Sequence, residues 1–98
     1  MERSERIKKA IFAAIDEINL QLSKEKKLRK SMDTALFGED GGLDSVEFIT
    51  FVIVTEQKIE NEFGVTITLT NEQALSRGKS PFKDVGNLTE YISELLEG

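Results

Sequence analysis

The chain has 98 residues, of which 39% are hydrophobic and 32% are charged, and its net charge is −5 at pH 7. This length allows one small domain with a single core, and this composition is typical of a folded, helix-rich protein. Because the sequence contains neither cysteine nor histidine, thiolate and imidazole catalysis and the usual zinc sites are excluded.

Charge is distributed unevenly along the chain. Residues 1–30 carry nine Lys or Arg against five Asp or Glu, whereas residues 31–98 carry four against thirteen. Because phosphate contacts dominate nucleic-acid affinity, the acidic part argues against a nucleic-acid partner. The basic cluster at residues 24–30, KEKKLRK, has two interpretations: a solvated surface segment, which is usual for short charge runs, or a docking patch for an acidic partner.

The sequence shows no membrane segment. Its most apolar stretch, FITFVIV at residues 48–54, has seven residues, far fewer than the roughly 20 that a membrane-spanning helix needs. The charged N-terminus lacks the apolar stretch and small-residue cleavage site of a secretory signal. We therefore expect a cytoplasmic protein without a membrane span.

The first predicted helix covers residues 4–22, where apolar residues recur at the spacing of one helix face. Its inner face is expected to consist of Ile7, Ile11, Ala14, Ile15, Ile18 and Leu22. A long connection follows, with apolar residues that are candidates for folding over the core: Leu28, Met32, Leu36 and Phe37.

The second predicted helix begins at Ser45. Asp44 followed three residues later by Glu47 is a capping-box pattern, and Gly64 predicts the end of the helix. Two adjacent apolar rows are expected to face the core: Val46, Ile49, Ile53 and Phe48, Val52, Ile59, Phe63. Phe51 and Val54 fall outside these rows, so part of the apolar surface is expected to face a partner.

The remaining chain predicts a connector and two further helices. Residues 65–69 alternate like a strand but have no partner strand, so we expect an extended connector with Val65, Ile67 and Leu69 in the core. Capping-box patterns predict a short helix over residues 70–78 and a last helix beginning near Asn87. The inner face of the last helix is expected to contain Leu88, Tyr91, Ile92, Leu95 and Leu96.

These elements together predict an all-α fold. It is a four-helix up-and-down bundle with a long first loop and a short third helix, forming a single domain over residues 1–98. Val46, Ile53, Phe63, Ile92 and Leu95 are its expected core residues.

Catalysis has little support in the sequence. The chain has no histidine to activate Ser45, and no lysine base is visibly near it, so nucleophilic catalysis lacks a mechanism. The acidic residues form no reaction-specific constellation and are mostly expected on solvated helix faces. We therefore expect a protein that is not an enzyme.

A calcium loop is not predicted at EDGGLD, residues 39–44, because neither register fits an EF-hand. With Gly41 at loop position 6, Leu36 and Gly38 occupy ligand positions; with Gly42 there, Phe48 occupies position 12. No metal site is expected. Loose binding of a divalent ion stays open for Glu39, Asp40, Asp44 and Glu47.

Ser45 has a special place as the first residue of the predicted second helix. Its hydroxyl is expected among unpaired amides at the positive end of the helix dipole, which favours a phosphate. Gly41 and Gly42 leave room for another enzyme to reach the side chain. Taken alone, an Asp-Ser pair more often simply begins a helix.

Three segments in order resemble the acyl carrier proteins and related peptidyl carriers: GGLDSVEF at residues 41–48, IENEFGV at residues 59–65 and FKDVGNLTEYISELL at residues 82–96. The family signature is Asp-Ser-Leu at the start of the second helix, then an acidic-flanked Phe-Gly and a closing helix. The resemblance covers nearly the entire chain and matches the predicted four-helix layout.

The resemblance implies that Ser45 is the attachment point of 4′-phosphopantetheine, transferred from coenzyme A by a phosphopantetheinyl transferase. Asp44 would cap the helix and help the transferase recognise the site. The implied function is a monomeric, non-catalytic carrier that holds acyl groups as thioesters. A loading ligase and enzymes of a fatty-acid, lipid or specialised biosynthetic pathway would be its partners. The absence of cysteine agrees with a carrier function, since no thiol of the protein would compete for the thioesters.

The partner-facing surface is expected on the second helix, at Val46, Glu47, Thr50, Phe51, Val54, Glu56 and Glu60. Its glutamates are expected to attract basic patches on partner enzymes, because rim charges set association rate and partner choice. Val46 stands where the family has leucine, and the second helix is about one turn longer than in fatty-acid carriers. Both departures favour a specialised carrier with a dedicated pathway.

Two alternatives stay open. An aminoacyl or peptidyl carrier, loaded by an adenylating enzyme, would show the same motifs because the loading enzyme selects the cargo. A protein of a different class, an unmodified helical interaction module, would use the second helix as its docking face.

Overall fold

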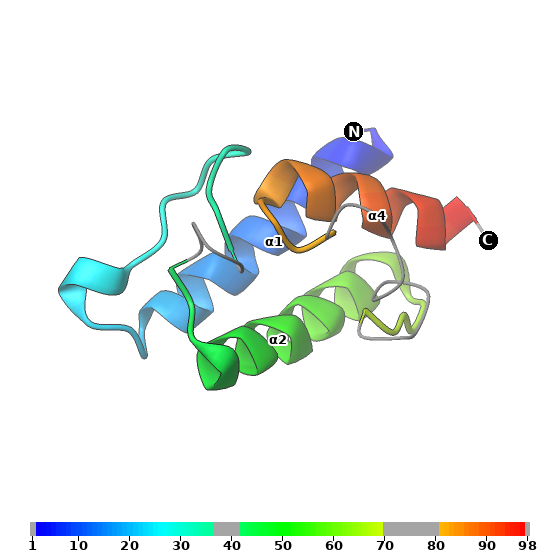
Figure 1. The fold of residues 1–98 in the computed structure, drawn as a ribbon. Coiled ribbons are helices and arrows are strands. Elements are labelled where there is room, and N and C mark those ends of the chain that lie inside the picture. The colour runs from blue at the N-terminus through cyan, green and yellow to red at the C-terminus, as the bar shows by residue number, and fades with distance from the viewer. Residues whose placement is uncertain (1, 37–41, 70–80, 98) are drawn as a thin grey trace.

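The computed structural model describes residues 2–36, 42–69 and 81–97. Within these ranges the chain forms three α-helices, one 3₁₀ turn and no strand. The elements are α1 (Arg3–Asn19), η1 (Lys24–Lys26), α2 (Ser45–Phe63) and α4 (Val85–Glu97), as Figure 1 shows. The fold is all-helical and compatible with a helical bundle. The short helix predicted at residues 70–78 lies outside the described residues, so the count of four helices stays a prediction.

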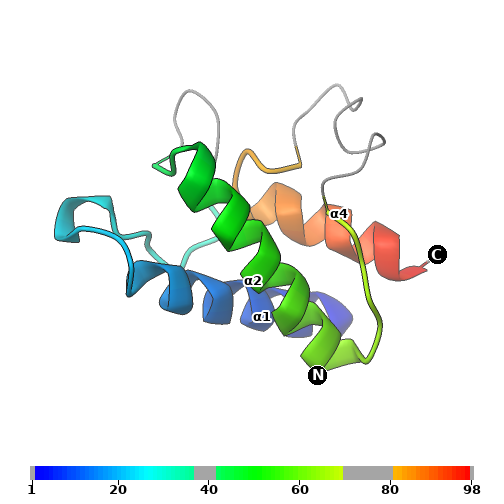
Figure 2. The same cartoon turned by 90° about the horizontal axis from the view of Figure 1, so that it is seen from below.

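The first helix, α1, packs against both α2 and α4 (Figure 2). All six residues predicted for its inner face are buried, including Leu22 just beyond its end. Arg3 pairs with Glu97 near the end of α4, and Arg6 pairs with Glu62 near the end of α2. Because Arg3 and Arg6 lie at the start of α1 and their partners lie near the ends of α4 and α2, both helices run in roughly the opposite direction to α1, and α2 crosses it obliquely (Figure 2).

The second helix, α2, begins and ends where the sequence predicts. The capping box between Asp44 and Glu47 is complete, and Gly64 follows the last residue with a φ of 72°. This left-handed conformation favours glycine, which ends the helix without the strain of a Cβ atom.

The face of α2 that packs on the core differs from the prediction. Phe51, Val52, Thr55 and Ile59 are buried, whereas Val46, Ile49 and Ile53 are 74%, 56% and 50% exposed. Val46 and Ile53 were therefore wrong as core residues. Apolar residues fill almost every position of residues 46–54, so their spacing alone does not define one face.

A polar residue lies on the inner face of α2. Thr55 is fully buried, and its hydroxyl donates to the carbonyl of Phe51 at 2.8 Å. A threonine that satisfies its hydroxyl inside its own helix can lie in a core without an unpaired polar group. This explains how a polar side chain shares the inner face with Phe51 and Ile59.

The connection between α1 and α2 is fixed by two hydrogen bonds between the Asn19 side chain and the backbone of Leu28 and by the burial of Leu36. The Asn19 side chain donates to the Leu28 carbonyl at 2.9 Å and accepts from the Leu28 amide at 2.8 Å. Leu36 is fully buried, Leu28 is half-buried and packs on the core, and Met32 is 39% exposed. The predicted packing is therefore confirmed for Leu36 and Leu28, while Phe37 lies outside the described residues.

Residues 32–36 lie along the start of α4. The amides of Val85 and Gly86 donate to the carbonyls of Thr34 and Met32 at 3.1 and 2.9 Å. The amide of Leu36 donates to the carbonyl of Lys83 at 3.0 Å. An irregular segment thus satisfies the first amides of a helix that is distant in the sequence.

The helix α4 begins before the predicted site near Asn87. Asp84 precedes its first residue and accepts a hydrogen bond from the Asn87 amide at 2.8 Å, so the aspartate is the cap. Asn87 resembles a cap in sequence, but the contacts to residues 32–36 extend the helix to Val85. Of the predicted inner face, Leu88, Tyr91 and Ile92 are buried, and Leu95 and Leu96 are half-buried against the core.

The segment after α2 forms no helix or strand over residues 65–69, and its residues differ in burial. Leu69 is fully buried and Ile67 is half-buried against the core, but Val65 is 45% exposed, so its predicted core position was wrong. Among the described residues, no helix is long and apolar enough to cross a membrane.

Candidate functional site

Ser45 is the first residue of α2 and its side chain is exposed. In Figure 1 the start of α2 lies away from the C-terminal ends of α2 and α4, which pair with Arg6 and Arg3. The residue before it, Asp44, is also exposed, and so is Gly42. The hydroxyl group is therefore accessible to another protein.

The hydrogen bonds of the capping box leave part of the helix end open. The amide of Glu47 donates to Asp44 Oδ1 at 2.8 Å, and the Asp44 amide donates to Glu47 Oε1 at 3.0 Å. The Phe48 amide donates to the Asp44 carbonyl at 2.8 Å. Among the residues that the structure describes, the Ser45 hydroxyl and the amides of Ser45 and Val46 have no hydrogen-bond partner. These donors and the helix dipole favour an anion at Ser45.

Lys26 lies beside Asp44 and Glu47 at this site. The sequence does not predict this placement of Lys26. Its Nζ donates to Glu47 Oε1 at 2.7 Å and lies 3.9 Å from Asp44 Oδ2. The bonds between Asn19 and Leu28 fix the connection from α1 and so place Lys26 next to α2. The ammonium group offsets part of the negative charge of the two carboxylates that flank Ser45.

The ion pair shifts both groups in the directions that favour their charged forms. The hydrogen bond to Glu47 raises the pKa of Lys26 above its ordinary 10.5. The hydrogen bond from Lys26, followed by the bond from the Asp44 amide, lowers the pKa of Glu47 below its ordinary 4.5. Both side chains are therefore charged at neutral pH.

We expect this pair to stabilise the fold over a defined pH window. The lowered pKa of Glu47 stabilises above pH 4.5, and this contribution is lost as pH falls through the folded-state pKa. The raised pKa of Lys26 stabilises below pH 10.5, and this contribution is lost as pH rises through its folded-state value. Lys26→Met is expected to raise the pKa of Glu47 toward 4.5, measured by NMR titration of the Glu47 carboxylate.

Lys27→Met is the matched control, because Lys27 is exposed and forms no ion pair with any described residue. It should leave the Glu47 titration at its wild-type position. An unchanged Glu47 titration in Lys26→Met would contradict the role of the ion pair.

The predicted partner surface is only partly exposed. Phe51 is fully buried in the core, which corrects its predicted place on that surface, and Val54 is half-buried against the core. Val46 is well exposed, and Thr50 is half-buried with its hydroxyl donating to the Val46 carbonyl at 3.0 Å.

The three glutamates of the predicted partner surface all make contacts within the chain. Glu47 binds Lys26, and Glu56 Oε2 accepts from the Leu69 amide at 2.8 Å. Glu60 Oε1 lies 3.4 Å from the Thr66 hydroxyl, which donates to it. Their carboxylates are therefore less available to basic groups of a partner than the sequence suggests.

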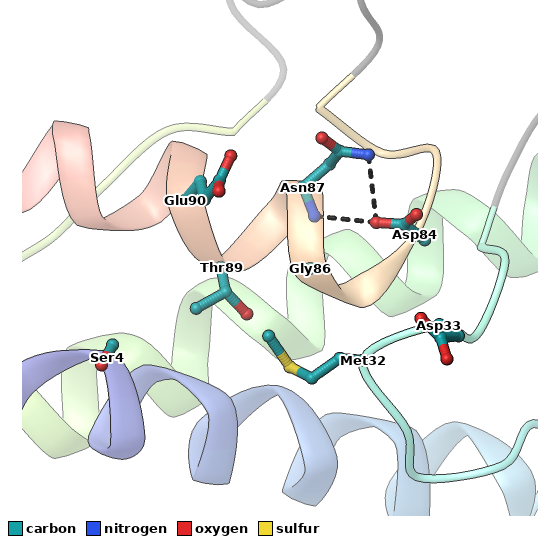
Figure 3. Close-up of a pocket in the computed structure, with 8 residues that line it drawn as sticks. All are labelled: Ser4, Met32, Asp33, Asp84, Gly86, Asn87, Thr89 and Glu90. Carbon is teal, nitrogen blue, oxygen red and sulfur yellow. Dashed lines mark hydrogen bonds between the residues drawn. The ribbon is translucent and has the colours of Figure 1, made fainter.

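A hollow of about 460 Å³ lies at the start of α4 (Figure 3). It is lined by Ser4, Met32, Asp33, Asp84, Gly86, Asn87, Thr89 and Glu90. One of its carboxylates, that of Asp84, accepts hydrogen bonds from both the amide and the side chain of Asn87, at 2.8 and 3.0 Å. No group of three or more acidic residues in the described part of the chain is arranged to hold a metal ion. Glu39 and Asp40, half of the loose cation site left open above, lie outside the described residues.

Comparisons of this chain with protein-family models, with curated proteins and with solved structures found no match. The choice of function therefore depends on the site at Ser45 and on the motifs around it. What this site offers chemically is an exposed hydroxyl beside two amides that have no partner among the described residues, on a chain without histidine or cysteine. Such a site can accept a group that another enzyme transfers. It contains no imidazole or thiol that could catalyse a reaction of that group.

Proposed function

We propose that the protein is a carrier that receives a 4′-phosphopantetheine arm on Ser45 and presents acyl groups to partner enzymes. The observation that carries this proposal is the exposed Ser45 hydroxyl at the first position of α2, beside two amides without partners among the described residues. A phosphodiester is an anion of the size that a helix N-terminus stabilises. The resemblance of the motifs at residues 41–48, 59–65 and 82–96 to carrier proteins supports the same function.

The residues around Ser45 fit such an arm. The amides of Ser45 and Val46 are donors for phosphate oxygens, and the positive end of α2 contributes about 0.3–1 kcal/mol to an adjacent anion. Lys26 offsets the repulsion that Asp44 and Glu47 would exert on a further negative charge. A side chain at Gly42 would meet Leu28 Cδ2 at 3.6 Å, an ordinary contact distance, and Gly42 itself is exposed.

In this role the chain would hold and orient its cargo and perform no chemistry on it. When bound, the arm supplies a terminal thiol that forms thioesters. Ser45 Oγ would form the phosphodiester while the nucleotide part of coenzyme A leaves, and the hydroxyl proton would pass to a base of the transferring enzyme. Asp44 and Glu47 are engaged in the capping box, where they keep the first turn of α2 ordered for that enzyme.

The proposal is tested by incubating the purified protein with coenzyme A and a broad-specificity phosphopantetheinyl transferase. Intact mass should increase by one arm, and proteolysis followed by mass spectrometry should place it on the peptide containing Ser45. A wild-type mass that stays unchanged while a known carrier is modified in the same reaction would overturn the proposal.

The exposed residues Val46, Ile49 and Ile53 also support a function of a different class, an unmodified interaction module that docks through α2. The same reaction separates the two functions, because a docking module gains no mass. An aminoacyl or peptidyl cargo would share the modified serine, and loading of the arm with amino acids by an adenylating enzyme would identify it.

A further inference from the structure

Met32 contacts the start of α4 with both its backbone and its side chain. Its carbonyl accepts a hydrogen bond from the Gly86 amide at 2.9 Å. Its terminal methyl, Cε, lies 4.0 Å from the position that a Cβ atom would take at Gly86, which is an ordinary apolar contact distance. In Figure 3 the thioether points into the hollow at the start of α4, which Met32 helps to line. One residue therefore combines a hydrogen bond to the helix start with an oxidisable sulfur.

The two ends of residues 32–36 are held unequally. Leu36 is fully buried, and its amide donates to the Lys83 carbonyl at 3.0 Å. Met32 is 39% exposed, so solvent and small dissolved molecules reach it. The end at Leu36 is thus fixed by the core, whereas the end at Met32 depends on the bond to Gly86 and on the contacts of a partly exposed thioether.

The lining of the hollow suits an apolar thioether better than a polar sulfoxide, whose oxygen is a hydrogen-bond acceptor. Three of the lining side chains are carboxylates: Asp33, Asp84 and Glu90. The Asn87 side chain already donates to Asp84, at 3.0 Å. The Thr89 hydroxyl already donates to the Val85 carbonyl, at 2.8 Å. Oxidation of Met32 would place a negative oxygen beside these carboxylates, which favours departure of the side chain into solvent.

Sulfur within the described residues is concentrated at Met32. The sequence has two methionines and no cysteine, and Met1 lies outside the described residues. Oxidation of methionine to its sulfoxide turns a flexible apolar side chain into a polar one, and sulfoxide reductases reverse the change. We propose that Met32 is an oxidative modification site, at which conversion to the sulfoxide by a hydroperoxide loosens the start of α4.

The reaction balances without a catalytic group from the chain. A lone pair of Met32 Sδ attacks the terminal oxygen of the hydroperoxide, so that the S–O bond forms as the O–O bond breaks. Sulfur loses two electrons and the peroxide gains them. The peroxide proton passes to the departing oxygen, which leaves as water from hydrogen peroxide or as an alcohol from an organic hydroperoxide.

The structural consequence is confined to the first turn of α4. Departure of the Met32 side chain removes its contact with Gly86 and weakens the hydrogen bond between their backbones. The bond from the Asn87 amide to Asp84 and the burial of Leu36 do not involve the sulfur, so the rest of α4 stays packed on α1. Amide hydrogen exchange is the matching measurement, because it reports local opening residue by residue.

The test treats the full ¹⁵N-labelled chain with hydrogen peroxide until peptide mapping by mass spectrometry shows one added oxygen on Met32. Exchange of the Gly86 amide is expected to accelerate about fivefold, as for the loss of one backbone hydrogen bond. Amides in the middle of α2 should exchange at the rate of the untreated protein. Treatment with methionine sulfoxide reductases for both sulfoxide epimers should restore the original Gly86 rate.

Two variants separate oxidation from other effects of peroxide. Met32→Leu keeps an apolar side chain of similar size without sulfur, so peroxide should leave its Gly86 exchange unchanged. Because Met1 is still present in this variant, the comparison also removes any contribution of Met1. Met32→Gln introduces a polar side chain of similar length, and it should accelerate Gly86 exchange about fivefold without peroxide.

Three outcomes contradict the inference. They are resistance of Met32 to a peroxide dose that fully oxidises a short methionine peptide, unchanged Gly86 exchange after Met32 is oxidised, and equal acceleration in treated Met32→Leu. Acceleration of equal size throughout α1 and α2 would also contradict it, because the whole fold would then be loosened. The experiment does not use the transferase reaction at Ser45, so failure here is distinct from failure of the carrier function.

Discussion

Ser45→Ala is expected to abolish modification completely. The variant should show no gain in intact mass after reaction with coenzyme A and the transferase, because no hydroxyl remains at the start of α2 to form the phosphodiester. Its free energy of unfolding should stay within about 0.5 kcal/mol of wild type, since the exposed hydroxyl has no hydrogen-bond partner among the described residues. Urea unfolding followed by circular dichroism measures this second quantity.

Ser4→Ala is the matched control for this experiment. Ser4 is also an exposed serine in the first turn of a helix, but no capping aspartate precedes it. The Ser4→Ala variant should gain the same mass as wild type. Modification that persists in Ser45→Ala would place the acceptor elsewhere and remove the basis of the proposed function.

Phe51→Ala is expected to cause the largest loss of stability. The side chain is fully buried between α2 and the rest of the core, and its removal leaves a cavity that costs about 3–5 kcal/mol. A domain of this size is stable by roughly 5–15 kcal/mol, so a large part of its stability would be lost. The shift of the urea unfolding midpoint measures the change.

Val46→Ala gives the corresponding control on the same helix. Val46 is 74% exposed, and alanine has the higher helix propensity, so the change in unfolding free energy should stay within about 0.5 kcal/mol. Equal losses at Phe51 and Val46 would show that the inner face of α2 is not the one described here.

Local signals in the sequence predict the bounds of α2, whereas α1 ends at Asn19 and not at residue 22, and α4 begins at Val85 and not near Asn87. The capping box at Asp44 and Glu47, with Gly64 at the other end, predicts both ends of α2, because these signals act between near neighbours. Periodicity predicts the inner face of α1, where the buried apolar residues recur at the three- and four-residue spacing of one helix face.

Features that depend on distant contacts are not predicted. The inner face of α2 is ambiguous in sequence because residues 46–54 are almost all apolar, and only the packing against α1 decides that Phe51 lies inside and Val46 outside. The start of α4 at Val85 coincides with contacts to residues 32–36, whose carbonyls accept its first two amides.

The candidate site likewise combines a feature that local sequence predicts with one that depends on distant contacts. The position of Ser45 at the start of a helix follows from local pattern, and the structure confirms it. The approach of Lys26 depends on how Asn19 holds the connection after α1, so no spacing rule reveals it. The charge around the serine is therefore a property of the tertiary structure.

The contact of residues 32–36 with the start of α4 has a consequence for folding kinetics. The carbonyls of Met32 and Thr34 must be in place before the first turn of α4 is complete. Helical proteins usually fold fast because their contacts are close in sequence, and long-range contacts slow the search. The final helix should thus consolidate late, after the central connection has ordered, although α4 is short and strongly amphipathic.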